Sequence, residues 1–397
     1  MFSDRTNWKL TRNRLTEALE EVRASGARVL DLTLSNPTRA GLRYDEARIL
    51  QSLASPQAMD YDPQPLGLPG ARAAVADYYR TLLGIGQGIR QGIRHFDPER
   101  LILTTSTSEG YSFVFRLLCN PGDELLVPKP SYPLFEFLAD LQDVRLAPYP
   151  LIYDHGWQMD FPSLEKVVTK RTRGVVVVHP NNPTGSYVHA HEQEALNRFC
   201  REHKVAIIAD EVFLDYAHNG APEHSFAANQ DVLTFTLSGV SKISALPQMK
   251  VAWVATSGPA EQVEAAQARL EMISDTYLSM NAPIQWAVPA LLEQRKDIQR
   301  QLLERVRGNL AELDRRLAMQ TTCQRLSVEG GWYAVLRVPV TQTDEELVVD
   351  LLRRKSVLVH PGHFYDFPGD GYLVLSLITP GAEFAEGIGG LLERMGS

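Results

Sequence analysis

The chain has 397 residues, of which 44% are hydrophobic and 22% are charged, and its formal net charge is −8. This length exceeds that of a single hydrophobic core, so we expect two domains, and the ordinary composition excludes disordered, collagen-like and coiled-coil proteins. The acidic balance, without a basic cluster, argues against a nucleic-acid partner.

The first hundred residues combine helical and extended patterns. We expect a helix over residues 13–24, a strand over 31–35, a turn over 36–42 and a helix over 71–83. Residues 84–94 carry glycines spaced as in a dinucleotide-binding loop, but they follow a helix, whereas that loop follows a strand. We therefore interpret this segment as a surface loop.

From Leu101 onward, strand patterns alternate with helix patterns. The apolar run over residues 174–180 is nearly continuous, as expected for a strand that is buried on both faces. Such alternation predicts an α/β fold with a mostly parallel central sheet, whose ligands bind at the carboxyl ends of the strands. The expected strands cover 101–105, 124–128, 174–180, 205–210, 231–237 and 250–256, and the expected helices cover 109–118, 133–141 and 192–203.

The last hundred residues predict a second, smaller α/β domain. We expect one long helix over 287–319, a helix over 344–355, and strands within 330–339, 356–362 and 372–378. The expected division is an N-terminal segment, 1–45, that packs with the small domain, a large domain, 46–285, and a small C-terminal domain, 286–397.

Three segments at strand ends carry the chemistry: 175–185, 205–216 and 236–253. Taken alone, Asn182 lies in an ordinary turn, Asp210 could cap a helix, and Lys242 could be a surface lysine. The three residues are separated by 28 and 32 residues, about one strand and one helix each, so they can converge at adjacent strand ends. In this order they resemble the pyridoxal-phosphate-dependent aminotransferases of classes I and II, which have the aspartate-aminotransferase-like fold type I. The resemblance extends from about Asp31 to about Leu377.

The resemblance implies a role for each of the three residues. Lys242 would hold pyridoxal 5'-phosphate as a Schiff base and later shuttle a proton at the substrate α-carbon. Asp210 would pair with the ring nitrogen, because a buried carboxylate keeps that nitrogen protonated. Asn182 would bind the phenolic oxygen of the cofactor and contact the substrate.

Other cofactor contacts are also implied by the resemblance. Ser106, Thr107 and Ser108 match the phosphate loop at the start of a helix, and Lys250 takes the place of a phosphate-binding arginine. Tyr132 matches the aromatic residue that stacks on the ring. Tyr61 matches a tyrosine that reaches the phosphate of the partner subunit, which implies a homodimer.

The sequence departs from the family pattern at three places. Phe213 replaces a tyrosine, and Gly239 replaces a serine, with Ser238 and Ser241 beside it as substitutes. Val374 stands where many members bind the substrate α-carboxylate with an arginine, and an apolar side chain cannot form that ion pair. Ser35 is a candidate contact for this carboxylate, and Arg39 and Arg337 are the cationic candidates. Asn182, together with backbone N–H groups, is the remaining candidate.

Cysteine and histidine usage gives no sign of a metal site. The cysteines Cys119, Cys200 and Cys323 are far apart and odd in number, which argues against a disulfide framework and favours a cytoplasmic protein. The histidine-rich segments 189–192 and 360–363 lack a third metal ligand nearby. Residues 1–10 do not resemble a signal peptide, and we expect no membrane span.

These observations favour an aminotransferase that moves an amino group between an amino acid and a 2-oxo acid. A lyase or decarboxylase on the same fold is the alternative, since fold alone does not choose the reaction. A non-catalytic regulator is disfavoured because Asn182, Asp210 and Lys242 are all present. If no cation replaces the arginine missing at Val374, an amine or a modified amino acid becomes the better substrate.

Overall fold

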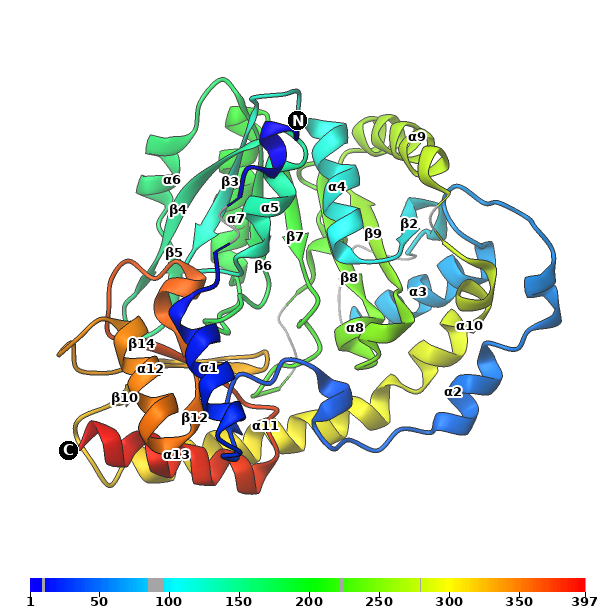
Figure 1. Cartoon of the computed structure of the whole chain (residues 1–397). Coiled ribbons are helices and arrows are strands. Elements are labelled where there is room, and N and C mark those ends of the chain that lie inside the picture. Colours follow the sequence, from blue (N-terminus) through cyan, green and yellow to red (C-terminus); the bar gives the residue numbers. More distant parts are fainter. Residues whose placement is uncertain (9–10, 85–95, 221–223, 279, 397) are drawn as a thin grey trace.

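The centre of the molecule is an eight-stranded sheet (Figure 1). The computed structural model describes residues 1–8, 11–84, 96–220, 224–278 and 280–396. The sheet has the order β2-β9-β8-β7-β6-β3-β4-β5. The five strands from β8 to β4 run parallel, whereas β9 is antiparallel to both of its neighbours and β5 is antiparallel to β4. The strands are β2 (Leu101–Thr104), β3 (Glu124–Lys129), β4 (Arg145–Tyr153), β5 (Trp157–Met159), β6 (Thr172–Val178), β7 (Ala206–Asp210), β8 (Thr234–Gly239) and β9 (Ala252–Ser257).

Helices cover both faces of this sheet. Along β6, Val176 and Val178 pack on one side, and Val175 and Val177 pack on the other, because successive side chains of a strand point to opposite faces. The first face is covered by α4 (Thr107–Leu118), α5 (Leu134–Asp140) and α9 (Ala260–Tyr277). The second is covered by α3 (Pro69–Leu82), α6 (Phe161–Val167), α7 (Ala190–His203) and α10 (Ala282–Glu293). The prediction of an α/β fold with a mostly parallel central sheet is confirmed.

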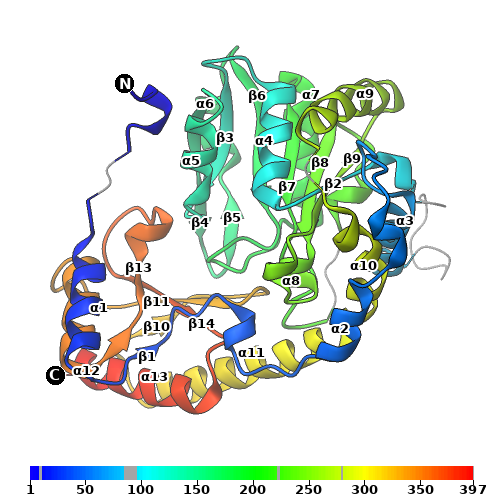
Figure 2. The same ribbon diagram turned by 45° about the vertical axis from the view of Figure 1, so that its right-hand side comes forward.

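A smaller antiparallel sheet lies beside the large one, in the order β10-β11-β14-β13. Its strands are β10 (Gln324–Arg325), β11 (Tyr333–Arg337), β13 (His360–Pro361) and β14 (Tyr372–Ser376), with helices α12 (Asp344–Lys355) and α13 (Gly381–Met395). The N-terminal helix α1 (Arg14–Ala24) packs against α12, as Figure 2 shows. Strand β1 (Leu30–Asp31) pairs in parallel with β12 (Val357–Leu358).

The strand predicted over residues 31–35 is wrong beyond Asp31. The Asp31 carboxylate accepts hydrogen bonds from the backbone N–H and the hydroxyl of Thr33, at 2.8 and 2.6 Å. This local contact bends the chain into a turn, because a short acidic side chain competes with the strand for backbone donors. The predicted loop over residues 84–94 lies, apart from Gly84, outside the described residues.

The single long helix predicted over residues 287–319 is also wrong. Helix α10 contains Pro289 and ends at Glu293, and a separate helix, α11 (Arg295–Leu317), follows Gln294. The Arg295 guanidinium donates to the carbonyl oxygen of Leu292 at 2.7 Å, an acceptor that a continuous helix would use for the N–H four residues on. From this break, α11 runs along the bottom of the molecule to α13 of the small sheet (Figure 1).

A tight turn after β6 fastens the large sheet to the segment that enters the small one. Gly185 has a φ of 69°, and its carbonyl oxygen accepts hydrogen bonds from the N–H groups of Glu329 and Gly330. A Cβ atom at position 185 would lie 2.4 Å from a methyl carbon of Val328 and 2.5 Å from the carbonyl oxygen of Gly330. Only glycine fits this approach of two backbones.

We therefore expect Gly185→Ala to lower the free energy of unfolding by about 2 kcal/mol or more, since it combines left-handed backbone strain with a backbone clash. Urea unfolding of the purified protein measures this loss. The matched control is Gly156→Ala, because a Cβ atom at Gly156 meets nothing within 4 Å. Equal stability of the two variants would contradict the interpretation of this turn.

Candidate active site

The sequence-predicted residues meet at one edge of the large sheet. Strands β6, β7 and β8 are parallel neighbours, so their carboxyl ends lie side by side. Asp210 is the last residue of β7 and is paired in register with Val178 of β6 and Leu237 of β8. Lys242 follows β8 directly, in the short helix α8 (Val240–Ile243). The turn that contains Asn182 follows β6.

The amine of Lys242 lies between aromatic rings. Its Nζ atom is 4.9 Å from the ring centre of Trp332 and 5.4 Å from that of Phe213. Burial lowers the pKa of Lys242 to about 8, and the nearby charge of Asp210 offsets this shift only in part. A larger fraction of the amine is therefore neutral and nucleophilic than in a surface lysine.

The Asp210 carboxylate is held by two hydrogen bonds. One oxygen accepts from the Val212 N–H at 3.1 Å, and the other accepts from the Tyr111 hydroxyl at 3.0 Å. Burial raises the pKa of Asp210 to about 6, while these two bonds and the Lys242 charge oppose that shift. The Tyr111 ring is buried in α4 against Phe115 and Phe135. Sequence reasoning missed Tyr111, whose one signal is an aromatic residue in the first turns of the helix behind the phosphate loop.

The N-terminus of α4 provides a site for an anion near this carboxylate. Ser106 caps the helix by accepting from the Glu109 N–H at 3.2 Å, and Thr107 and Ser108 are the first helical residues. The first N–H groups of a helix have no partner within the helix and point outward, which favours a phosphate. Lys250 is exposed and has a left-handed backbone, with a φ of 53°.

The two serines beside Gly239 differ in their surroundings. The Ser238 hydroxyl donates to the carbonyl oxygen of Glu211 at 3.4 Å, inside the protein. Ser241 is partly buried and adjoins Lys242 in α8. Ser241 is therefore the serine that stands closer to the site. A Cβ atom at Gly239 would lie 2.7 Å from the Val251 carbonyl oxygen, so this backbone leaves no room for the serine that the family resemblance implies.

The surroundings of Asn182 indicate a missing polar ligand. Its side-chain carbonyl oxygen is buried and has no hydrogen-bond partner among the described residues. Buried polar atoms are normally paired, so a bound group with donors and acceptors fits here. Tyr132 is 45% exposed, and the Ser131 N–H before it donates to the Tyr365 carbonyl oxygen at 2.9 Å. The Lys242 amine, the Asp210 carboxylate, the N–H groups at the start of α4 and the Asn182 amide together fit the groups of pyridoxal phosphate.

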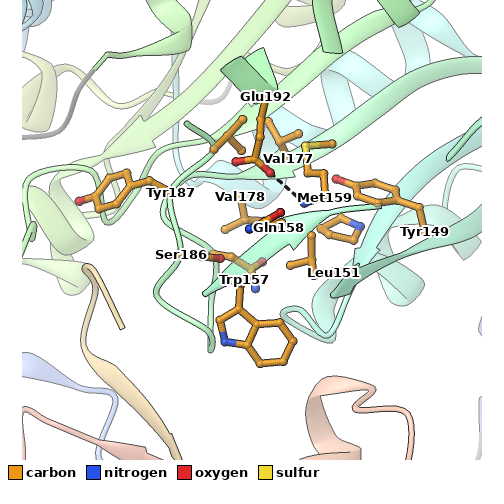
Figure 3. A pocket seen from close by; sticks show the side chains of 13 residues that line it. Tyr149, Leu151, Trp157, Gln158, Met159, Val177, Val178, Ser186, Tyr187 and Glu192 are labelled. Carbon is orange, nitrogen blue, oxygen red and sulfur yellow. Dashed lines mark hydrogen bonds between the residues drawn. The ribbon is translucent and has the colours of Figure 1, made fainter. Parts of the chain in front are cut away.

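A small cavity of about 20 Å³ lies beside the end of β6 and the turn that follows it (Figure 3). Glu192 points into it and accepts hydrogen bonds from the N–H groups of Met159 and His189, at 2.8 and 2.9 Å. The Trp157 ring points away from Glu192 and packs edge-on against Phe367. Glu192, the acidic residue of the histidine-rich segment 189–192, thus links α7 to β5 by a hydrogen bond and is not part of a candidate metal cluster among the described residues. Within the described parts of the chain, no cluster of three or more histidine, cysteine or acidic residues could hold a metal ion.

Four of the predicted residues lie on exposed parts of the structure. Ser35 and Arg39 are exposed on the N-terminal segment. Arg337 is exposed as well, lies over the Tyr372 ring at 5.7 Å and donates to its hydroxyl at 3.1 Å. Tyr61 is 83% exposed and lines a surface cavity of about 280 Å³ with Gly67 and Gln285, among others.

Apart from Phe213, sequence reasoning missed the aromatic residues near the lysine. Trp332 and Tyr333 come from the segment that Gly185 fastens, and Tyr216 donates its hydroxyl to the Lys242 carbonyl oxygen at 2.6 Å. Trp332 packs edge-on against both Phe213 and Tyr216. Trp332 is 90 residues away from Lys242 in the chain, so no local pattern links the two.

Comparisons with known proteins agree with this geometry. A family model described as aminotransferase class I and II matches residues 46–380. An alanine aminotransferase of Mycobacterium tuberculosis is 28% identical over 94% of this chain and 86% of its own length. A glutamate-pyruvate aminotransferase of Escherichia coli is 27% identical over 86% of this chain and 84% of its own length.

Solved structures share the fold. An alanine aminotransferase from Pyrococcus furiosus superposes with a TM-score of 0.89 at 22% identity, and covers 100% of both chains. A Thermus thermophilus aspartate aminotransferase double mutant gives a TM-score of 0.84 at 22% identity, over 99% of both chains. No helix among the described residues is long and apolar enough to cross a membrane.

The raised pKa of Asp210 predicts how the stability of the cofactor-free protein depends on pH. The folded state holds this proton up to about pH 6, whereas the unfolded carboxyl releases it near pH 4, so the contribution of Asp210 to stability is lost as pH rises through this window. Asp210→Asn should therefore stabilise the apoprotein relative to wild type by on the order of 2 kcal/mol more at pH 7.5 than at pH 4.5. Urea unfolding at both pH values measures the difference. Tyr111→Phe removes a hydrogen-bond donor to the carboxylate, so the loss of stability with rising pH should occur at a higher pH than in wild type. Identical pH profiles of stability for all three proteins would contradict the raised pKa of Asp210.

Proposed function

Because this chain belongs to the class I and II aminotransferases, and is thus an enzyme that transfers amino groups with pyridoxal phosphate, we propose that Lys242 binds the cofactor covalently and that Asp210 pairs with its ring nitrogen. The observation that carries the proposal is the meeting of these two residues at adjacent strand ends, close enough for each to shift the pKa of the other.

The cofactor, when bound, supplies an electron sink for the charge left when the substrate α-carbon loses its proton. Lys242 moves that proton, and its lowered pKa of about 8 suits it to act as a base. Asp210, held by Tyr111, favours a protonated ring nitrogen. Tyr132 stacks on the ring, and Asn182 binds the phenolic oxygen.

The phosphate lies, in this proposal, at the N-terminus of α4. Ser106, Thr107 and Ser108 supply backbone and hydroxyl donors, and Ser241 adds a further hydroxyl from α8. Lys250 supplies a positive charge, as a point charge without the planar fork of an arginine.

We propose an L-α-amino acid as donor and a 2-oxo acid as acceptor. The relatives that support this class are named for alanine and for glutamate and pyruvate, so L-alanine and L-glutamate are the first donors to test. Three free cysteines, Cys119, Cys200 and Cys323, support a cytoplasmic location. Residues 46–285 would form the large domain, and 286–397 the small domain, with which the segment 1–45 packs.

Borohydride reduction of the yellow holoenzyme should fix the cofactor to Lys242, as peptide mass spectrometry would show. Lys242→Ala should fold, with a circular dichroism spectrum like that of wild type, but should lose turnover by several orders of magnitude because the proton carrier is gone. Lys250→Ala is the matched control, since it should weaken cofactor binding without moving the site of attachment. Attachment to another lysine would show that the assignment is wrong.

A homodimer with shared active sites predicts complementation between two inactive variants. In a mixed dimer of Tyr61→Ala and Lys242→Ala, one site would hold both intact residues and the other neither. Random subunit pairing should therefore recover about a quarter of wild-type activity, although each variant alone is inactive. No recovery, or a fully active monomer in sedimentation velocity, would refute the shared site.

A further inference from the structure

The strand pairing shows what surrounds the position of the missing arginine. Val374 lies buried in β14, between β11 and β13. It pairs directly with Val335 on one side and with His360 on the other. Directly paired residues of antiparallel strands point to the same face of the sheet, about 5 Å apart. His360 therefore shares a face and a row with the side chain that an arginine at position 374 would present.

This face of the small sheet is the one that looks toward Lys242. Tyr333, which pairs with Ser376 two residues from Val374, lies on the same face and packs edge-on against Phe213 at 6.2 Å. Phe213 in turn lies beside the Lys242 amine. The Ser376 hydroxyl donates to the Leu34 carbonyl oxygen, directly before Ser35.

A tyrosine fixes the orientation of the His360 ring. The Nδ1 atom of His360 lies 3.0 Å from the Tyr365 hydroxyl. Burial raises the pKa of Tyr365 well above its usual value, so this hydroxyl keeps its proton and can donate it to Nδ1. The imidazole then carries its own proton on Nε2, which becomes a hydrogen-bond donor. The Tyr365 backbone adjoins Ser131, next to the predicted ring-stacking residue Tyr132.

The arginine on the same face is placed too far along the strand. Arg337 is four residues beyond Tyr333, roughly 13 Å at about 3.3 Å per residue, and it is engaged by Tyr372. Along this face, His360 is thus the hydrogen-bonding side chain in the row of Val374.

We propose that His360, oriented by Tyr365, binds the α-carboxylate of the amino-acid substrate in place of the arginine that is missing at Val374. This inference rests on the proposed aminotransferase function and names the residue that distinguishes an amino acid from an amine. A single imidazole N–H provides one hydrogen bond where an arginine provides two, so the carboxylate is held by a directed donor with less fixed charge.

The test compares an amino acid with the amine that lacks its carboxylate. Holoenzyme is mixed with L-alanine or with ethylamine, and conversion of the bound cofactor to its amine form is followed by absorbance. His360→Ala should raise the half-saturating concentration of L-alanine roughly 10- to 100-fold, the factor expected for a hydrogen bond to a charged group, with a smaller change in limiting rate. The response to ethylamine should stay unchanged. His360→Gln, which keeps a donor, should recover part of the loss.

Two further variants separate recognition from a structural role. Tyr365→Phe keeps the ring and its packing, and should weaken L-alanine selectively by a smaller factor. Arg337→Ala should affect neither donor. An equal loss for both donors in His360→Ala and Tyr365→Phe, or a loss in Arg337→Ala as large as in His360→Ala, would overturn the proposal.

Measurements on the wild-type protein distinguish a failure of the His360 proposal from a failure of the proposed aminotransferase function. If wild type accepts ethylamine as readily as L-alanine, the carboxylate site is refuted while amino transfer stands. If the cofactor is attached to Lys242 but no amino donor converts it, the proposed function fails, and the role of His360 fails with it.

Discussion

The parallel pairing of β6, β7 and β8 is the constraint on which the proposed site depends. The carboxyl ends of parallel strands lie at one edge of the sheet. The turn with Asn182, the carboxylate of Asp210 and the helix with Lys242 therefore lie together at that edge. The valines of β6 pack into the hydrophobic cores on both faces of the sheet, and close packing of this kind resists displacement of the strand. A rigid edge holds reactive groups at fixed positions without a cost at the moment of reaction.

Burial at this edge shifts the two ionisable groups in opposite directions. It lowers the pKa of Lys242 to about 8 and raises that of Asp210 to about 6, because the charged form of each group is penalised. The Tyr111 hydroxyl and the Val212 N–H oppose the shift at Asp210 and keep the carboxylate available. Perturbed pKa values of this kind are common at catalytic sites.

The small sheet completes the site from the other side. The segment before β11 is fastened to the turn at Gly185, and this attachment brings Trp332 over Lys242. The same sheet presents the face that carries Val374 and His360. In the proposed function, the residues that hold the cofactor come mainly from the large sheet, whereas the residue that would bind the substrate carboxylate comes from the small sheet.

The sequence by itself determined the parts that local patterns encode. Alternating apolar runs predicted the parallel sheet, and the spacing of Asn182, Asp210 and Lys242 predicted adjacent strand ends. The expected helix and strand, α7 and β7, lie between Asn182 and Asp210, whereas the described residues between Asp210 and β8 form only a short 3-10 helix, Phe226–Ala228. The helices predicted at α1, α3, α4, α7 and α12 are present. The break between α10 and α11 was not predicted, because a side-chain hydrogen bond, such as that from Arg295 to the Leu292 carbonyl oxygen, does not alter the hydrophobic periodicity of the sequence. The turn at Asp31 was also not predicted, because it depends on a hydrogen bond between two side chains, those of Thr33 and Asp31.

Only the tertiary structure decided which distant residues share the site. Tyr111 reaches Asp210 across 99 positions of the chain, and Trp332 reaches Lys242 through a backbone contact at Gly185. His360 became a candidate only through its register against Val374. Contacts of this kind depend on packing between elements and on strand register, and the side-chain periodicities of a single strand or helix carry no information about either.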